Sequence, residues 1–279
     1  MILLDNSQII LANIFHSMKD NPTINDDFIR HMVLNSYRLI RKKFSLEYGQ
    51  LIICNDSPNC WRKEVFPLYK QNRKIKQKTG NIDWTQIYSS MSKIVTEVAN
   101  VFPYKNIKIE GAEADDIIAI LARNFHNDEK IVIVSNDKDF QQLQVYENIK
   151  QYSTFQKDFI VCANPRLFLC EHIIRGDASD GVPNILSDDD TIINVDKRQG
   201  KITKKVMQDA LSSLDTIETS KYSRNWNRNK TLIDFSHIPQ SLEDKIMEAY
   251  KIDIKHSHTI LDDMIEHKLN NLIGSISEF

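Results

Sequence analysis

EGAEADDIIAILARNFHNDEKIVIVSNDKDF, residues 110–140, joins a helix-like segment and a strand-like segment to five carboxylates. The apolar spacing within 117–121 predicts one face of a helix, and 131–134 (IVIV) predicts a buried strand. Asp137 follows the end of that strand, and open α/β sheets bind their ligands at this carboxyl edge. Carboxylates brought there by apolar segments are suited to hold hard cations. They are Glu113, Asp115, Asp116, Asp137 and Asp139.

Two earlier segments repeat the pattern of an apolar strand that ends in a carboxylate. Residues 2–4 run into Asp5, and residues 50–55 (QLIICN) run into Asp56. Asp5 taken alone is better explained as a helix N-cap, because Asp is a good capping residue. Two strands with the same ending are harder to explain in that way. Both aspartates are therefore candidates for the carboxyl edge of the sheet.

The order of the predicted elements indicates the fold class. Strands and helices alternate over the first 160 or so residues, as in a mainly parallel α/β sheet flanked by helices. We predict a catalytic α/β domain over 1–183 and a helical C-terminal subdomain over 184–279. The predicted strands are 2–4, 50–55, 106–109, 131–134 and a hairpin of 149–153 with 158–162, and the predicted helices include 26–47, 83–102, 165–175, 206–214, 222–233, 241–252 and 258–276.

Composition narrows the classes of function. The 279 residues are 41% hydrophobic and 27% charged, with a formal net charge of −2, as in a globular protein. The sequence lacks both a run of about 18 apolar residues and the features of a signal peptide, so we expect a cytoplasmic protein without membrane association. Its four cysteines have no CxxC spacing and indicate reduced thiols. Cys162, Cys170 and His172 do not have the spacing of a common structural zinc site.

Residues 61–78 (WRKEVFPLYKQNRKIKQK) form a basic segment with interleaved aromatic residues. Seven lysines and arginines are opposed only by Glu64, and Trp61, Phe66 and Tyr69 lie among them. A phosphate backbone suits such charges, and the rings would be available to stack on bases. A solvated, charge-rich loop is the alternative, but the position directly after the Asp56 strand favours nucleic-acid contact.

A further loop, RGDASDGVPN, supplies Asp177 and Asp180, although a turn is its default explanation. So many carboxylates at one sheet edge cannot all be ionised without cations. Oxygen ligands suit Mg²⁺ or Mn²⁺, and two such ions about 4 Å apart promote phosphodiester hydrolysis. For Asp116, direct ligation and an indirect role at the helix N-terminus are equally favoured, because acidic residues there also complement the helix dipole.

With these residues in place, the chain resembles the 5′-nuclease (flap endonuclease) superfamily, and within it the ribonuclease H branch of T-even-type bacteriophages. The resemblance covers nearly the whole chain. It is carried by ILLDNSQI, CNDSPNCWRKEVFPLYKQNR, EGAEADDIIAIL, IVSNDKDFQQL and RGDASDGVP, together with LIDFSHIP and SISEF near the C-terminus. The EADD, SxDxDF and GDxxDxxP motifs are individually weak but specific in this order.

The resemblance implies a PIN-like 5′-nuclease fold, a basic arch over 61–80 and two Mg²⁺ ions, with Mn²⁺ as a substitute. Lys70 and Arg73 match the basic pair that contacts the scissile phosphate, and Tyr69 is placed to stack a base. The nucleophile implied is water rather than a side chain. The first metal cluster corresponds to Asp5, Asp56, Glu113, Asp115 and Asp137, and the second to Asp139, Asp177 and Asp180.

The activity implied is that of a 5′→3′ exonuclease and flap endonuclease with ribonuclease H activity, which removes RNA primers and adjacent DNA during lagging-strand replication. The substrates implied are RNA–DNA hybrid, 5′-flap, forked and duplex DNA. A single-strand-binding protein or a sliding clamp is implied as partner, with the enzyme a monomer in the host-cell cytoplasm if phage-encoded. The expected nucleic-acid contacts are Arg62, Lys63, Tyr69, Lys74 and Lys76, and, where the family's Gly-rich hairpin is replaced, Lys197, Arg198, Lys201, Lys204 and Lys205.

Two other hypotheses remain at this point. A non-catalytic nucleic-acid-binding replication protein could keep the same fold, although every expected acidic position is filled. A PIN-type nuclease acting on single-stranded RNA is disfavoured by the long basic segment and the helical tail.

Overall fold

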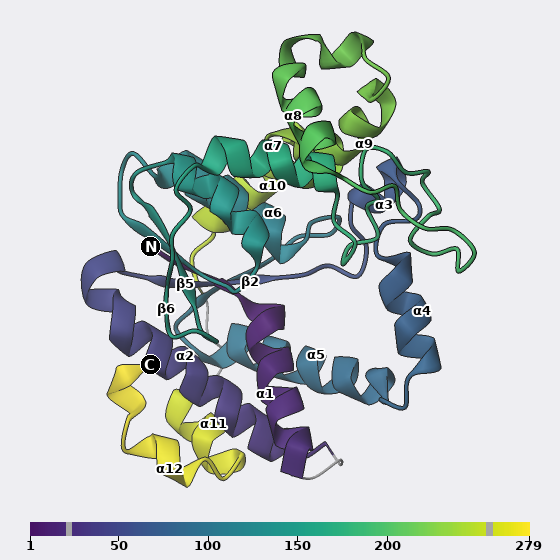
Figure 1. The fold of residues 1–279 in the computed structure, drawn as a ribbon. Coiled ribbons are helices and arrows are strands. Elements are labelled where there is room, and N and C mark those ends of the chain that lie inside the picture. Colours follow the sequence, from purple (N-terminus) through teal and green to yellow (C-terminus); the bar gives the residue numbers. More distant parts are fainter. Residues whose placement is uncertain (21–23, 255–258) are drawn as a thin grey trace.

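The computed structural model describes residues 1–20, 24–254 and 259–279, and a six-stranded sheet lies at its centre (Figure 1). The strand order is β3-β2-β1-β4-β5-β6. All neighbouring strands pair in parallel except β5 and β6, which form the antiparallel edge hairpin. The mainly parallel sheet is therefore confirmed. Its strands are β1 (Ile2–Asp5), β2 (Leu51–Asn55), β3 (Lys105–Lys108), β4 (Ile131–Val134), β5 (Ile149–Ser153) and β6 (Asp158–Ile160).

The central strands are buried on both faces, which explains their unbroken apolar sequences. Ile2 and Leu4 of β1 face one hydrophobic cluster, whereas Leu3 faces the other. In β4, Val132 and Val134 join the first cluster, and Ile131 and Ile133 join the second. This alternation is the two-residue period of a strand, and it fixes the register of the parallel pairs.

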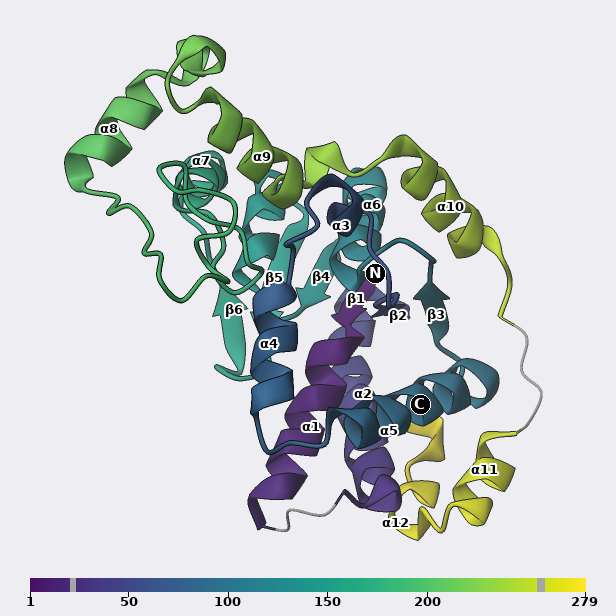
Figure 2. The same cartoon turned by 90° about the vertical axis from the view of Figure 1, so that its right-hand side faces the viewer.

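Helices cover both faces of the sheet (Figures 1 and 2). One face packs against α1 (Asn6–Asp20), α2 (Asp26–Tyr48) and α5 (Trp84–Val101), and the other against α6 (Ala114–Phe125) and α10 (Gln240–Lys251). The predicted helices at 26–47 and 83–102 thus correspond to α2 and α5. Asn25 and Asp83 begin these two helices, because each side chain accepts a hydrogen bond from a backbone N–H of the first turn.

A third hydrophobic cluster lies beside the sheet and includes Phe66, Tyr69, Ile174, Met207 and Trp226. It joins the segment after β2 to the helices that follow the sheet. Below α3, helix α4 stands apart from the body of the molecule at the right of Figure 1. The remaining helices of this part are α3 (Arg62–Val65), α4 (Gln71–Thr79), α7 (Pro165–Arg175), α8 (Lys204–Ser212) and α9 (Ser223–Ile233), with short 3-10 helices at Lys138–Val145, Leu214–Thr219, Phe235–His237 and Ile276–Glu278.

The end of the chain departs from the predicted single helix at 258–276. The structure has α11 (Ile260–Glu266) and α12 (Asn270–Ile273), and residues 255–258 lie outside the described residues. Lys268 adopts a left-handed conformation with φ 55°, which ends the first helix and turns Leu269 into the core. The prediction was wrong because burial of Leu269, Leu272 and Phe279 against the α1–α2–α5 face outweighs helical propensity.

Residues after 184 contribute to all three hydrophobic clusters. Helix α9 packs beside α7, α10 covers α6, and α11 with α12 reaches the opposite face of the sheet. The helical C-terminal region thus wraps around the sheet. Across the described residues, no helix is long and apolar enough to cross a membrane.

Candidate active site

The parallel sheet brings three of the predicted carboxylates, Asp5, Asp56 and Asp137, to one edge. Asp5 ends β1, Asp56 follows β2, and Asp137 comes three residues after β4. Since β1 lies between β2 and β4, these carboxyl ends are neighbours. Asp5 is buried, and its carboxylate accepts a hydrogen bond of 2.9 Å from the Ser135 hydroxyl. Asp5 also directly precedes α1, and its Oδ1 accepts from the Gln8 N–H at 3.5 Å, so the same residue caps that helix and lies at the sheet edge.

The N-terminus of α6 adds three more carboxylates. Glu113 caps the helix and forms a reciprocal capping box with Asp116, whose carboxylate accepts from the Glu113 N–H at 2.9 Å. Asp56 is anchored to the same turn, because its Oδ1 accepts from the Ala114 N–H at 2.8 Å. Asp115 lies between the capping residues, where burial and then the Asp137 and Asp5 carboxylates raise its pKa.

The carboxyl groups of this cluster have raised pKa values because they are buried close to one another. Burial raises the pKa of Asp5 to about 7, and the nearby Asp56 and Asp137 carboxylates add to the shift. Burial and the charges of Asp137 and Asp5 likewise hold the pKa of Asp115 well above its ordinary value. Carboxylates that repel one another in a buried place favour either protons or metal cations.

Arg62 provides a buried positive charge beneath α6. Its Nη1 lies 3.0 Å from Glu113 Oε2, its Nη2 lies 2.9 Å from Asp116 Oδ1, and its Nε donates to the Leu232 carbonyl at 2.8 Å. The side chain is only 3% exposed, so the predicted contact between Arg62 and nucleic acid is wrong. Asp116 is fully buried and committed to Arg62 and to the helix cap. The indirect role is thus the better explanation of Asp116.

The aromatic residues of the basic segment are core residues. Trp61, Phe66 and Tyr69 are all buried, at 7% exposure or less, so their rings are not free to stack on bases. The stacking expected of Tyr69 is therefore wrong. Its hydroxyl instead lies 2.8 Å from Asp180 Oδ2 and 3.1 Å from Glu113 Oε2. The ring joins the third hydrophobic cluster, and the hydroxyl links two carboxylates that are far apart in the sequence.

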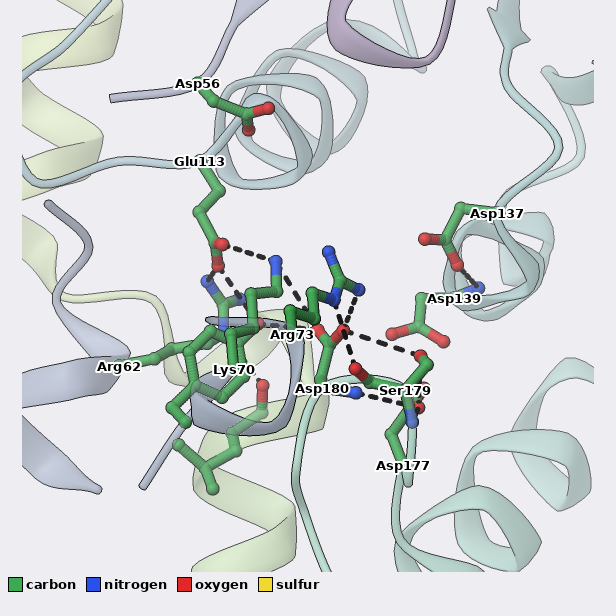
Figure 3. Close-up of polar contacts among 12 residues, drawn as sticks. Asp56, Arg62, Lys70, Arg73, Glu113, Asp137, Asp139, Asp177, Ser179 and Asp180 are labelled. Atoms are coloured by element: carbon green, nitrogen blue, oxygen red, sulfur yellow. Dashed lines mark hydrogen bonds and ion pairs between the residues drawn. The ribbon is translucent and has the colours of Figure 1, made fainter. Parts of the chain in front are cut away.

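Lys70 and Arg73 lie between the two groups of carboxylates (Figure 3). Lys70 Nζ is 2.5 Å from Glu113 Oε1 and 3.5 Å from Asp180 Oδ2, and Arg73 forms an ion pair with Asp180. Burial by itself would raise the pKa of Glu113, but the charges of Lys70 and Arg62 and the hydrogen bonds from Lys70 and Tyr69 lower it to about 2. Two cations thus already neutralise part of the acidic centre.

The loop that carries Asp177 and Asp180 is fastened to the start of α4. The Lys70 N–H donates to the Asp180 carbonyl at 2.7 Å, and Asn72 Nδ2 donates to the Ala178 carbonyl at 2.8 Å. Gly176 has φ 67°, and a Cβ there would lie 2.5 Å from the Pro183 carbonyl oxygen, so only glycine fits this turn. Hydrogen bonds therefore join the acidic loop to the base of the basic segment.

The second group of carboxylates contains a histidine that the sequence did not single out as a site residue. His172 Nε2 lies 3.5 Å from Asp139 Oδ1 and 3.4 Å from Asp177 Oδ2, and the donor atoms of the three residues all lie within 4.8 Å of one another. His172 is 6% exposed, and Nε2 and Asp139 Oδ1 are both buried without a hydrogen-bond partner. The only signal in the sequence was a histidine in the last turn of a helix just before Gly176.

The two aspartates of this second group have pKa values shifted in opposite directions. Burial and the Asp137 carboxylate raise the pKa of Asp139 to about 7. Burial opposes ionisation of Asp177 too, but the nearby His172 imidazole and the contacts with Ser179 and Lys138 hold its pKa far below the ordinary value. Lys138 Nζ is 3.0 Å from Asp177 Oδ2, a contact that the sequence did not predict. Asp177 is thus ionised beside a carboxyl group that readily keeps its proton.

The remaining predicted basic residues lie on two surfaces. Lys74 and Lys76 are exposed on α4, and Lys63 is half-buried, with its ammonium donating to the Pro58 carbonyl at 3.0 Å. The second surface surrounds the start of α8, where Lys197 pairs with Asp190 at 2.7 Å and with Asp188 at 3.4 Å. Its other members, all exposed, are Arg198, Lys201, Lys204 and Lys205.

The donor set fits divalent metal ions. Oxygen atoms dominate both groups, and several of the carboxyl groups have raised pKa values that a bound dication would reverse. The buried Asp139 Oδ1, without a hydrogen-bond partner, is suited to ligation. What the arrangement can do is hold cations beside two basic side chains that have affinity for phosphate.

Comparison with known proteins gives matches over the whole chain. The family model described as 5'-3' exonuclease, N-terminal resolvase-like domain, matches residues 1–166, and one described as T4 RNase H, C terminal, matches residues 164–279. Ribonuclease H of Enterobacteria phage T4 is 29% identical, over 99% of this chain and 95% of that protein. A 5'-3' exonuclease of Buchnera aphidicola is 28% identical, over 61% of this chain and 58% of that protein.

Solved structures share the fold. The T5 5'-exonuclease with bound divalent zinc has a TM-score of 0.63 at 17% identity, covering 90% of this chain and 98% of that one. A bacteriophage T5 flap endonuclease in a pseudo-enzyme-product complex with DNA and metal ions has a TM-score of 0.63 at 16% identity, covering 90% and 99% of the two chains. At this identity the likeness concerns the fold.

Proposed function

The chain belongs to the 5'-3' exonuclease family, and from this we propose that its acidic centre hydrolyses phosphodiester bonds in nucleic acids that have a free 5′ end. The protein is a nuclease that acts as a 5′→3′ exonuclease and flap endonuclease. The observation that carries this function is the convergence of carboxylates from β1, β2, β4, α6 and the loop after α7 beside Lys70 and Arg73. The non-catalytic alternative has no support from the relatives, which are named as nucleases.

We further propose that the centre binds two Mg²⁺ ions, for which Mn²⁺ can substitute. Bound dications would activate a water molecule and stabilise the leaving oxygen of the phosphodiester. The oxygen-rich donor set supports Mg²⁺. The first ion would be held by Asp5, Asp56, Glu113, Asp115 and Asp137, and the second by Asp139, Asp177 and Asp180, with His172 within reach.

Lys70 and Arg73 would bind the scissile phosphate. In this structure both cations are paired with Glu113 and Asp180. A dication that neutralises these carboxylates weakens their hold on the two side chains, and the phosphate oxygens then offer a better partner. Their positions at the start of α4 keep both groups beside the acidic centre, because Lys70 and Asn72 are hydrogen-bonded to the loop of Asp180. The role of the chain is to hold the phosphate where water can attack it in line.

For the substrates we propose RNA–DNA hybrids and 5′-flap, forked and duplex DNA, in the removal of primers during lagging-strand replication. A relative named ribonuclease H, matched over 95% of its length, supports the hybrid, and relatives named flap endonuclease support the flap. The exposed surfaces of α4 and of the start of α8 supply charge for duplex binding. We also propose that the protein is a monomer in the host-cell cytoplasm and that its partner is a single-strand-binding protein or a sliding clamp. The boundary between the catalytic and helical regions would lie near residue 183.

The test is to incubate purified protein with 5′-labelled RNA–DNA hybrid and 5′-flap DNA, with Mg²⁺ or with EDTA, and to size the products. Short 5′ products that need Mg²⁺ are expected from the wild type. Asp137→Asn and Asp139→Asn should each lower the rate by at least about 10²-fold, because a site for a cation is lost. Asp128→Asn, at an exposed aspartate before the start of β4 and so at the other end of that strand from Asp137, is the matched control and should cleave normally. Wild-type rates in both active-site variants would refute the assignment.

A further inference from the structure

A second group of metal-binding side chains lies outside the acidic centre, between α5 and α11. Glu97 comes from α5, whereas Asp263 and His267 come from α11 and the residue that ends it. One donor atom of each residue lies within 4.8 Å of the others. The i,i+4 spacing of Asp263 and His267 places both side chains on one face of the helix, toward Glu97. Figure 2 shows α11 beside α5, away from β1 and β4.

Two carboxylate oxygens in this group are buried without a partner. Glu97 Oε2 accepts from Arg30 Nε at 2.7 Å, but Glu97 Oε1 has no hydrogen-bond partner. Asp263 Oδ1 lies 3.3 Å from His267 Nδ1, but Asp263 Oδ2 has none. Asp263 is 7% exposed, so water does not serve in place of a partner over most of its surface. A buried carboxylate oxygen without a partner is costly, and both residues carry one here.

The neighbouring cations do not fully neutralise the carboxylates of this group. Arg30 is shared between Glu97 and Asp27, so it neutralises Glu97 only in part. Burial raises the pKa of Asp263, with His267 and Arg30 opposing the shift, and burial also raises that of Glu97. Lys93, which borders the same site, is paired with Asp26 at 2.7 Å. The unpaired oxygens therefore do not take their counter-charge from that lysine.

We propose that Glu97, Asp263 and His267 bind one Zn²⁺ ion, which fastens the C-terminal helix α11 to α5. One imidazole nitrogen and two carboxylate oxygens are a zinc donor set, and a water molecule would complete the tetrahedral coordination. An open groove of about 700 Å³, bordered by these residues, gives the ion and its water access. Mg²⁺ is disfavoured at this place, because it prefers all-oxygen octahedral coordination and imidazole suits zinc better.

The proposed ion has a structural use. Helix α11 spans only seven residues, and helices this short are not stable by themselves in water. Its buried apolar anchor in the core is Met264, with the partly buried Ile260 packed against the same cluster and Leu269 and Leu272 following the helix. A metal ion that joins α11 to the middle of the chain adds a cross-link that exists only in the folded state, so binding free energy becomes folding free energy.

The test uses Co²⁺ as a visible substitute for Zn²⁺, with excess Mg²⁺ present to occupy the acidic centre. The full-length protein should bind Co²⁺ with visible absorption bands of a tetrahedral site, and Zn²⁺ should displace it. The bands should persist in His172→Gln, which removes the imidazole of the acidic centre, and in the exposed-surface control His16→Gln. They should be lost in His267→Gln and Glu97→Gln. His267→Cys should restore binding with an added thiolate-to-cobalt charge-transfer band.

Stability provides the second readout. Zn²⁺ should raise the Tm of the wild type and of His16→Gln, and should not raise that of His267→Gln, while nuclease activity in Mg²⁺ stays at the wild-type level in His267→Gln. Unchanged Co²⁺ bands in His267→Gln would overturn the proposal. So would the absence of Co²⁺ binding in the wild type. Failure of the nuclease assay alone would concern the acidic centre and not this site.

Discussion

In the acidic centre, each buried charged side chain depends on an oppositely charged neighbour. Arg62 is paired with Glu113 and Asp116, whereas Lys70 and Arg73 are paired with Glu113 and Asp180, so the acidic centre is folded around its own counter-charges. Removal of one partner from a buried ion pair leaves the other uncompensated, which is costlier than the pair is stabilising. Removal of a fully buried cation should therefore lower the free energy of unfolding more than removal of an exposed one.

Arg62→Met should lower the free energy of unfolding by about 3–5 kcal/mol, because Asp116 would be left buried without its cation and Glu113 would keep only Lys70. Urea denaturation followed by circular dichroism measures it. Lys74→Met, at an exposed position on α4, should stay within about 0.5 kcal/mol of the wild type. Equal stability of the two variants would show that Arg62 is not the counter-charge of Glu113 and Asp116.

Stabilisation by Mg²⁺ should grow as pH rises from about 5 to 8. Burial raises the pKa of Asp5 and of Asp139 to about 7 in the metal-free protein, whereas both titrate near 3.8 in the unfolded chain. Between these values the folded state retains protons that the unfolded state has released, so the metal-free protein loses stability as pH rises through this window and levels off above it. Bound Mg²⁺ favours the ionised forms and offsets that loss.

The measurement is the difference in Tm between Mg²⁺ and EDTA across the same pH range. The difference should widen with pH in the wild type and widen less in Asp139→Asn, which cannot ionise. A difference that is constant with pH in both proteins would contradict the raised pKa of these carboxyl groups.

At the scale of elements, the site depends on how the loop after α7 meets the start of α4. Gly176→Ala should distort this loop, because a Cβ would lie 2.5 Å from backbone oxygens of Val182 and Pro183 at φ 67°. We expect a loss of more than about 1 kcal/mol in stability and a larger proportional loss of nuclease activity. Gly274→Ala is the control, since a Cβ there meets nothing within 4 Å and φ is −64°. Thermal unfolding and flap cleavage are measured on both variants, and normal cleavage by Gly176→Ala would count against a fixed loop.

Helix α4 should contribute phosphate affinity through its exposed lysines. Replacing Lys74 and Lys76 by Gln should weaken binding to a 5′-flap substrate and reduce the slope of log affinity against log salt by about 0.7–0.9 for each phosphate that the lysines no longer neutralise. Fluorescence anisotropy in EDTA measures it without cleavage. Lys245→Gln, exposed on α10, should leave the slope unchanged. A slope unchanged in the α4 variant as well would place the duplex elsewhere.

For the whole molecule, the sequence predicted the features that local pattern determines. Apolar strands that end in Asp5 and Asp56, and the strand that precedes Asp137, indicated the parallel sheet and the edge at which carboxylates gather. It failed where long-range burial decides. Nothing near Tyr69 or Arg62 in the sequence shows that they turn inward to meet Glu113, which follows 51 residues after Arg62. His172 was missed because only the packing of α7 on the segment after β4 brings it to Asp139.

The pairing of Lys70 and Arg73 with Glu113 and Asp180 has a thermodynamic consequence for how the enzyme is switched on. Metal ions compete for the carboxylates of these ion pairs, and a phosphate backbone competes for Lys70 and Arg73. A ligand that binds one member of a pair therefore frees the other member for the second ligand. Linkage requires this effect to be mutual: Mg²⁺ should tighten substrate binding by the same factor by which substrate tightens Mg²⁺ binding. Hydrolysis would then be fast only where both ligands are present, because the metal ion and the nucleic acid each raise the affinity of the centre for the other.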